Sequence, residues 1–156
     1  MVTPESSIRV FLDRAIKTSQ QYILTALSKL GEECVVRIRN RPSKSSWIDH
    51  TGNLRSSIGY AVYDNGQKFL SSSFEKLISG VEGSAKGKKM IENLAKEYSK
   101  TYALVVVAAM DYAAEVEALE SKDVLSSTKT WALSVVEQRI KTALEKAIKE
   151  INTWKL

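Results

Sequence analysis

The residues with the greatest catalytic potential lie in one short polar segment, where the only histidine, His50, follows Asp49. A hydrolytic triad needs a nucleophile, a base and an orienting acid that converge in space. Two residues that are adjacent in sequence do not supply this arrangement, and the nearby serines match no nucleophile elbow. We therefore expect His50 to be a polar loop residue, and we predict no catalytic residues and no enzymatic activity.

Metal chemistry is not expected either. The chain has one histidine and one cysteine, Cys34, which are too few ligands for an ordinary structural zinc site. Cys34 lies on the apolar stripe of an expected helix, so we interpret it as a small buried hydrophobic residue. A single thiol forms no internal disulfide, and nothing demands an oxidising compartment. We expect no metal and no cofactor.

A glycine-rich segment, residues 83–89, has the outline of a phosphate-binding loop. The motif needs a glycine where Glu82 stands and a serine or threonine where Lys89 stands, and no buried strand precedes it. We interpret the segment as a solvated glycine-rich loop. The densest acidic set is interpreted as a charged surface face, because carboxylates do acid–base work only in a cleft. Its members are Asp111, Glu115, Glu117 and Glu120.

A basic cluster near the end of the first expected helix consists of Arg37, Arg39, Arg41 and Lys44. These side chains can stabilise the C-terminus of the helix and aid solubility. They can also contact DNA phosphates, and the net charge of +5 permits an acidic partner. Both interpretations stay open, and the second makes weak DNA contact possible.

The residues before Pro42 are expected to form one long amphipathic helix, from about residue 4 to about residue 40. Thr3 is placed to cap it and Pro4 to occupy its first turn. A helix of that length spans about 55 Å, whereas a compact domain of this size is about 40 Å across. The helix must therefore either break, at Gly31, or project from the body, and a projecting apolar stripe needs a partner.

A β-hairpin is expected next. Residues 58–63 alternate as a strand does, with Ile58, Tyr60 and Val62 on one side. The Asn-Gly pair at 65–66 suits a type I′ turn, in which both central residues need positive φ. Residues 68–70 then form the second strand.

The rest of the chain completes an α+β pattern. Residues 71–87 are expected to be a flexible excursion, and residues 88–100 a short helix. The β-branched run 102–110 is typical of a central strand that is buried on both faces. A short strand at 122–125 and a second long helix at 127–153 follow. We predict a small, mostly antiparallel sheet with long N-terminal and C-terminal helices packed on it.

The totals agree with a single domain over residues 1–156. Hydrophobic residues make up 44% and charged residues 26%, close to an ordinary globular domain. The N-terminus lacks the pattern of a signal peptide. The most apolar run, residues 103–110, is far shorter than the roughly 20 residues that span a bilayer. We expect a soluble product of the cytoplasm with no membrane contact.

Two segments resemble the signatures of a known family. Residues 47–58 contain Trp, a spacer and Thr-Gly-Asn-Leu-Arg-Ser-Ser-Ile between a helix and a strand. Residues 106–117 contain a buried strand that runs into Tyr-Ala-Ala-Glu-Val-Glu. In this order, and with a closing amphipathic helix, they resemble the gp10-like tail-component, or neck, proteins of HK-type long-tailed bacteriophages and prophages. The family usually has a glycine shortly after Val-Glu, where residues 118–120 stand here, and a shorter segment at 71–100.

The resemblance implies a non-enzymatic structural protein of a phage or prophage particle. It would act in head–tail joining or tail assembly as a ring-forming subunit, located in the virion and in the host cytoplasm before assembly. Its partners would be copies of itself and other head–tail or tail proteins, and closed rings need head-to-tail surfaces.

The interface candidates are Trp47, Arg55, Tyr112 and Glu117. Arg55 either contacts a neighbouring subunit or forms a surface ion pair with an acidic residue after Met110. Tyr112 and Glu117 are either interface residues or residues at the edge of the core. The alternative function is a small basic nucleic-acid-binding module that uses the basic cluster.

Overall fold

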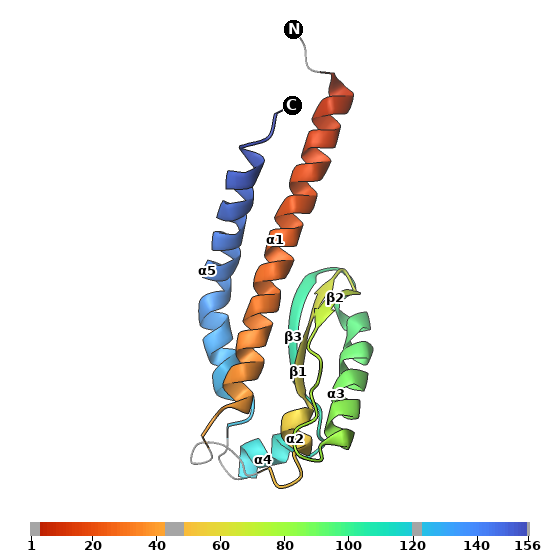
Figure 1. The fold of residues 1–156 in the computed structure, drawn as a ribbon, viewed down its shortest axis with the longest axis vertical. Helices are drawn as coiled ribbons and strands as arrows, with labels where there is room; N and C mark the ends of the chain where they lie inside the picture. Colours follow the sequence, from red (N-terminus) through yellow and green to blue (C-terminus); the bar gives the residue numbers. More distant parts are fainter. Residues whose placement is uncertain (1–3, 43–48, 120–122, 156) are drawn as a thin grey trace.

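Two long helices and a three-stranded antiparallel sheet make up most of the molecule (Figure 1). The structure, a computed structural model, describes residues 4–42, 49–119 and 123–155. The fold is α+β, with long N- and C-terminal helices packed on the three-stranded antiparallel sheet, as the sequence predicts. The elements are α1 (Glu5–Arg39), α2 (Asn53–Ser56), β1 (Ile58–Asp64), β2 (Gln67–Ser71), α3 (Val81–Leu94), the 3-10 helix η1 (Ala95–Tyr98), β3 (Tyr102–Ala108), α4 (Ala113–Leu119) and α5 (Ser126–Ile151).

Helix α1 is continuous over 35 residues and does not break at Gly31. That glycine instead lets the helix approach the sheet, because a Cβ there would lie 2.3 Å from Cδ2 of Tyr60. The C-terminal half of α1 is buried on the sheet, and its N-terminal half extends beyond it (Figure 1). Of the two alternatives, projection is therefore correct. Pro4 occupies the N-cap rather than the first turn, and Thr3 lies outside the described residues.

Helix α5 runs antiparallel beside α1 along most of its length (Figure 1). Phe11 meets Trp154 edge to face near the free end of this pair, with ring centroids 5.9 Å apart. Farther along, the Tyr22 hydroxyl donates a hydrogen bond to the Glu150 carboxylate at 2.8 Å. We call the part of α1 and α5 that extends past the sheet the arm. Both termini of the chain lie at its free end (Figure 1).

The hairpin forms as the sequence predicts. Asn65 and Gly66 have φ values of 49° and 83°, which is the type I′ requirement. The strand order is β2-β1-β3, and both pairings are antiparallel. The central strand is β1, whose residues 58–63 are all buried.

The prediction that residues 102–110 form a central strand is wrong, because β3 lies at an edge of the sheet. Its two faces are covered, by α1 on one side and by α3 on the other. The apolar sequence of β3 reflects the burial of both faces of the strand. It does not indicate whether the strand has a hydrogen-bonded neighbour on one side or on both. The expected strand at 122–125 is also absent from the described residues 123–125, which are irregular and lead into α5.

The interpretation of residues 83–89 as a solvated loop is wrong as well, because they lie inside α3. Gly83 and Gly87 face the body of the protein in this helix. A Cβ on Gly83 would lie 1.9 Å from the Asn53 carbonyl oxygen, and one on Gly87 would lie 2.3 Å from the Phe74 ring. These glycines permit close packing of α3 on its neighbours rather than a turn.

The sheet separates two hydrophobic clusters. The cluster on the α1 side includes Leu27, Ile38, Leu54, Ile58 and Val62. The cluster on the α3 side includes Ala61, Tyr63, Phe74, Ile91 and Val107. Ile58, Tyr60 and Val62 therefore share one face of β1, as expected. No helix within the described parts of the chain has the length and apolar composition needed to cross a membrane.

Replacement of Gly83 by alanine tests the close packing of α3. Helix propensity alone would make Gly83→Ala stabilising by up to about 1 kcal/mol. The clash with the Asn53 main chain reverses this sign, and we expect a loss of about 1–3 kcal/mol in the free energy of unfolding. Urea unfolding measures the change, with Lys88→Ala at an exposed site of the same helix as the control. A stabilised Gly83→Ala protein would contradict the packing described.

Candidate interaction surfaces

The turn that precedes α2 is held by side chains of the first signature segment. Gly52 adopts φ of 76°, a left-handed conformation that favours glycine. The Thr51 hydroxyl accepts a hydrogen bond from the Asn53 N–H at 3.3 Å. One Asp49 carboxylate oxygen accepts a hydrogen bond from the Arg55 N–H at 2.8 Å. Gly52 is therefore the N-cap of α2, and Thr51, one position earlier, bonds the first N–H of the helix.

The two signature segments, far apart in sequence, meet at one end of the sheet. The Ser57 hydroxyl accepts a hydrogen bond from the Ala109 N–H at 3.1 Å and donates one to the Leu54 carbonyl at 2.7 Å. Beside this contact, Ile58 pairs with Ala108. Buried side chains of both segments also share one cluster, namely Leu54, Ile58, Met110 and Ala113. Leu54 and Ile58 are both buried.

Three of the four interface candidates lie among the described residues. Arg55 is half-buried, Tyr112 is exposed and Glu117 is half-buried. The Glu117 carboxylate accepts a hydrogen bond from the Ser126 N–H at 2.9 Å, so it stabilises the start of α5. Burial, followed by the nearby charges of Asp49 and Glu82, raises the pKa of Tyr112. Trp47 lies outside the described residues.

Arg55 lines a polar groove of about 570 Å³ between α1 and the segment that follows β2. Glu32 and Glu75 give this groove negative charge, and Arg39 and Arg55 give it positive charge. Ser71, Ser72 and Ser73 add hydroxyl groups. A groove lined by both acidic and basic side chains is better suited to bind a polar protein surface than to bind a polyanion.

The acidic set after Met110 is spread over the surface. Asp111 pairs with Lys86 at 2.7 Å, and Lys86 also pairs with Glu82 at 3.2 Å. Hydrogen bonds to Asp111 and then to Glu82 raise the pKa of Lys86. Glu115 is exposed, and Glu120 lies outside the described residues.

The arginines of the basic cluster each interact with a different part of the chain. The Arg37 guanidinium lies over the Trp131 ring, 4.2 Å from its centroid. Arg39 donates a hydrogen bond to the Ile58 carbonyl at 2.8 Å and another to the Arg55 carbonyl at 3.3 Å. Burial lowers the pKa of Arg39. These contacts tie the end of α1 to α5 and to the first signature segment.

Arg41 joins the segment after α1 to the start of α5. Its guanidinium pairs with the Asp123 carboxylate at 2.8 Å and also donates a hydrogen bond to the Asp123 carbonyl. It donates two more, at 2.9 Å each, to the hydroxyls of Ser127 and Thr128. Lys44, the last member of the cluster, lies outside the described residues.

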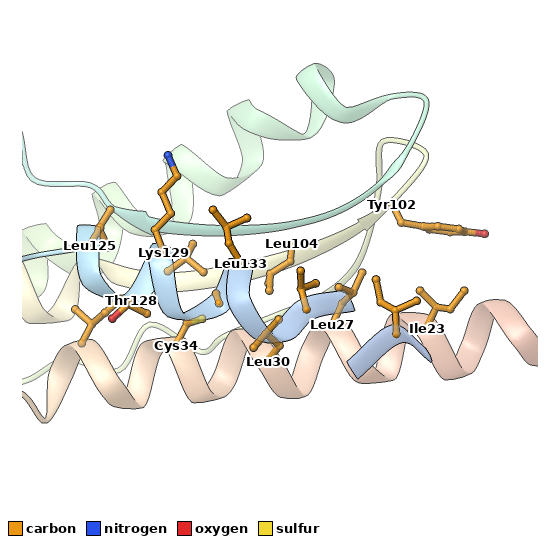
Figure 2. A pocket seen from close by; sticks show the side chains of 15 residues that line it. Ile23, Leu27, Leu30, Cys34, Tyr102, Leu104, Leu125, Thr128, Lys129 and Leu133 are labelled. Atoms are coloured by element: carbon orange, nitrogen blue, oxygen red, sulfur yellow. The ribbon is translucent and has the colours of Figure 1, made fainter. Parts of the chain in front are cut away.

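An apolar groove of about 590 Å³ lies between α1, β3 and α5 (Figure 2). Figure 2 shows Leu27 and Leu30 of α1, Leu104 of β3 and Leu133 of α5 around it. Sequence reasoning missed this groove, because its walls come from three elements whose spacing is set by the fold. The available signal was Leu133, an apolar residue on the expected stripe of the last helix, which is exposed in the structure.

The residues first considered for chemistry are apart from one another. His50 is exposed, and Cys34 is 1% exposed, as expected for a small buried hydrophobic residue. Burial is the main factor that raises the pKa of the Cys34 thiol. Within the described parts of the chain, no cluster of three or more histidine, cysteine, aspartate or glutamate side chains could hold a metal ion.

Comparison of the chain with known protein families, with curated proteins and with solved structures gives no significant match.

The link from Arg41 to Asp123 makes a measurable contribution to stability. We expect Arg41→Ala to lower the free energy of unfolding by about 2 kcal/mol, because it removes the ion pair with a partly buried carboxylate and the donor to the Asp123 carbonyl. Urea unfolding at pH 7 measures the loss. Arg9→Ala is the matched control, since Arg9 pairs with Glu5 on the exposed surface of α1, and its effect should stay within about 0.5 kcal/mol. Equal effects of the two variants would contradict this role of Arg41.

The contribution of Arg41 should also depend on pH. Burial raises the pKa of Asp123, but hydrogen bonds from Ser127 and the charge of Arg41 outweigh it, so the pKa is lower than usual. Stability from the charged carboxylate is present above the unfolded pKa of about 3.9, and is lost as the pH falls through the folded pKa. The stability difference between the wild type and Arg41→Ala should therefore shrink below about pH 4. A difference that stays constant from pH 7 to pH 3 would assign the effect to the uncharged hydrogen bonds alone.

Proposed function

We propose that this protein is a non-enzymatic structural subunit of a phage or prophage particle, which acts in head–tail joining or tail assembly as part of a ring. The observation that carries the proposal is the direct contact between the two signature segments, through Ser57 and Ala109. The residues that create the resemblance thus act together in one structural unit. A shared structural role for the two segments requires such a contact, which is why it supports the proposal.

The extent of exposed surface also supports an assembly role. A compact monomer of 17.4 kDa exposes about 7,900 Å² by the scaling of surface with mass. The chain exposes 9933 Å², which is about 2,000 Å² more. The chain is therefore less compact than a typical monomer of its mass, and its projecting helices offer surface for contact with neighbouring subunits (Figure 1).

The arm adds an apolar surface that the single chain leaves open. Ile8, Leu12 and Ile16 are all more than 40% exposed on α1, and Ile148 is 55% exposed on α5. Apolar side chains at this density on one projecting element are typical of a surface that contacts another protein. These side chains favour a contact between the arm and another protein, which is either a copy of the chain or another head–tail or tail protein.

The alternative, a nucleic-acid-binding module, has less support. Two of its arginines, Arg39 and Arg41, already donate hydrogen bonds to main-chain and side-chain groups of the protein. Arg37 is the exposed one of the three. A DNA-binding role predicts an affinity that falls with salt and weakens on Arg37→Ala while the thermal stability is kept. Fluorescence anisotropy with duplex DNA at several salt concentrations measures it.

Sedimentation velocity over a wide range of protein concentrations tests the assembly role. We expect a concentration-dependent shift from monomer to one closed oligomer, which negative-stain electron microscopy should show as a ring. The reason is that head-to-tail contacts stop growing only when the rotation closes. Monomer alone at every concentration, combined with salt-sensitive DNA binding, would overturn the proposal in favour of the alternative.

A further inference from the structure

Strand β3 lies at one edge of the sheet, yet it lacks the devices that usually protect such an edge. Residues 102–108 contain no charged residue, no proline and no glycine. They pair with β1 in unbroken register over seven positions. Natural proteins blunt exposed edges with charges, prolines or bulges, because unpaired main-chain groups recruit another strand. The composition of β3 is therefore that of a strand with neighbours on both sides.

The unpaired main-chain groups of β3 belong to the residues that face the apolar groove. The Tyr60 carbonyl accepts a hydrogen bond from the Ser72 N–H at 2.9 Å, so the peptide groups of Tyr60 point away from β3. Tyr60 stands opposite Val106, and main-chain groups alternate in direction along an antiparallel pair. Val106 and Leu104 therefore direct their N–H and C=O groups to the open side of the sheet. Both side chains line the groove between β3 and α5.

The opposite edge of the sheet offers a matching strand. Phe69 and Leu70 of β2 are 37% and 46% exposed. Leu70 stands opposite Val62, which stands opposite Leu104, so all three lie on the α1 side of the sheet. Strands β2 and β3 are both antiparallel to β1 and therefore run in the same direction. A second copy placed beside the first can thus continue the sheet with its Leu70 still on the groove side.

We propose that β2 of one copy pairs with the open edge of β3 in a second copy, with Leu70 of the incoming strand in the apolar groove between β3 and α5. The inference rests on the proposed ring, because this contact joins two different surfaces and repeats head to tail. It identifies which surfaces make the ring contact and joins the sheets of successive copies into one.

A charge substitution on β2 tests the contact. Leu70→Lys places a charge on an exposed strand, so the monomer should keep its fold and its thermal stability. We expect it to weaken oligomer formation about tenfold or more in sedimentation velocity, because the lysine would have to be desolvated in the groove. Leu133→Lys, at the groove wall on α5, should weaken it as well. Ile78→Lys and Val81→Lys are the matched controls, since these side chains are 76% and 58% exposed away from β2.

Cysteine cross-linking distinguishes this contact from other modes of association. Lys68→Cys on β2 is mixed with Ala103→Cys on β3, and the buried Cys34 leaves a low background in the wild type. We expect oxidation to link the two variants in the mixture and neither variant with itself. Cross-linking of Ala103→Cys with itself would show that two β3 strands pair, and would overturn the inference while leaving assembly intact.

The outcomes also separate this inference from the proposed function. A wild-type protein that forms oligomers unaffected by Leu70→Lys would overturn the strand pairing and leave the assembly role standing. A wild-type protein that stays monomeric at every concentration would overturn the strand pairing, and salt-sensitive DNA binding by the same protein would overturn the assembly role as well.

Discussion

The close packing of the C-terminal half of α1 across β1 is the interaction on which the rest of the molecule depends. It is made possible at Gly31, where the absence of a side chain lets the Tyr60 ring lie directly against the helix. Around this point α1 buries Leu24, Val35 and Ile38 in the main core. Helix α5 packs mainly on α1 and reaches the sheet only across the apolar groove. The position of α5, and with it the width of that groove, therefore follows from how α1 sits on β1.

Features that depend on neighbouring residues in the sequence could be predicted, and features that depend on contacts between distant segments could not. The Asn65-Gly66 turn is local, because its requirement for positive φ belongs to two residues alone. The helical stripes of α1 and α5 are equally local. By contrast, the pairing of Arg41 with Asp123 joins positions 82 residues apart, and no pattern near either residue indicates it. The glycines of α3 were interpreted as a loop because close packing between helices leaves the same sequence signal as a turn.

The same distinction between local features and contacts of distant segments applies to the candidate surfaces. Gly52 starts the short helix α2 with a positive φ, and Leu54 is buried two residues later, so both features depend on residues that are close in sequence. Arg55 and Glu117 could be named from the sequence, but their surroundings could not, because the groove beside Arg55 and the bond from Ser126 to Glu117 are products of tertiary packing. The β-branched run of β3 is the most informative mismatch. Its sequence is that of an interior strand and its position is that of an edge, and a neighbouring copy would reconcile the two.

The uninterrupted course of α1 has a mechanical consequence. A single hydrogen-bonded rod connects the body of the protein to the free end of the arm. The part of α1 that precedes Leu24, its first buried residue, corresponds to a lever of about 28 Å at 1.5 Å per residue. A rotation of the body by about 10° would displace the free end of the arm by about 5 Å, without any change in the local fold. Small changes in the orientation of the body would therefore produce larger displacements at the free end of the arm, because α1 is stiff.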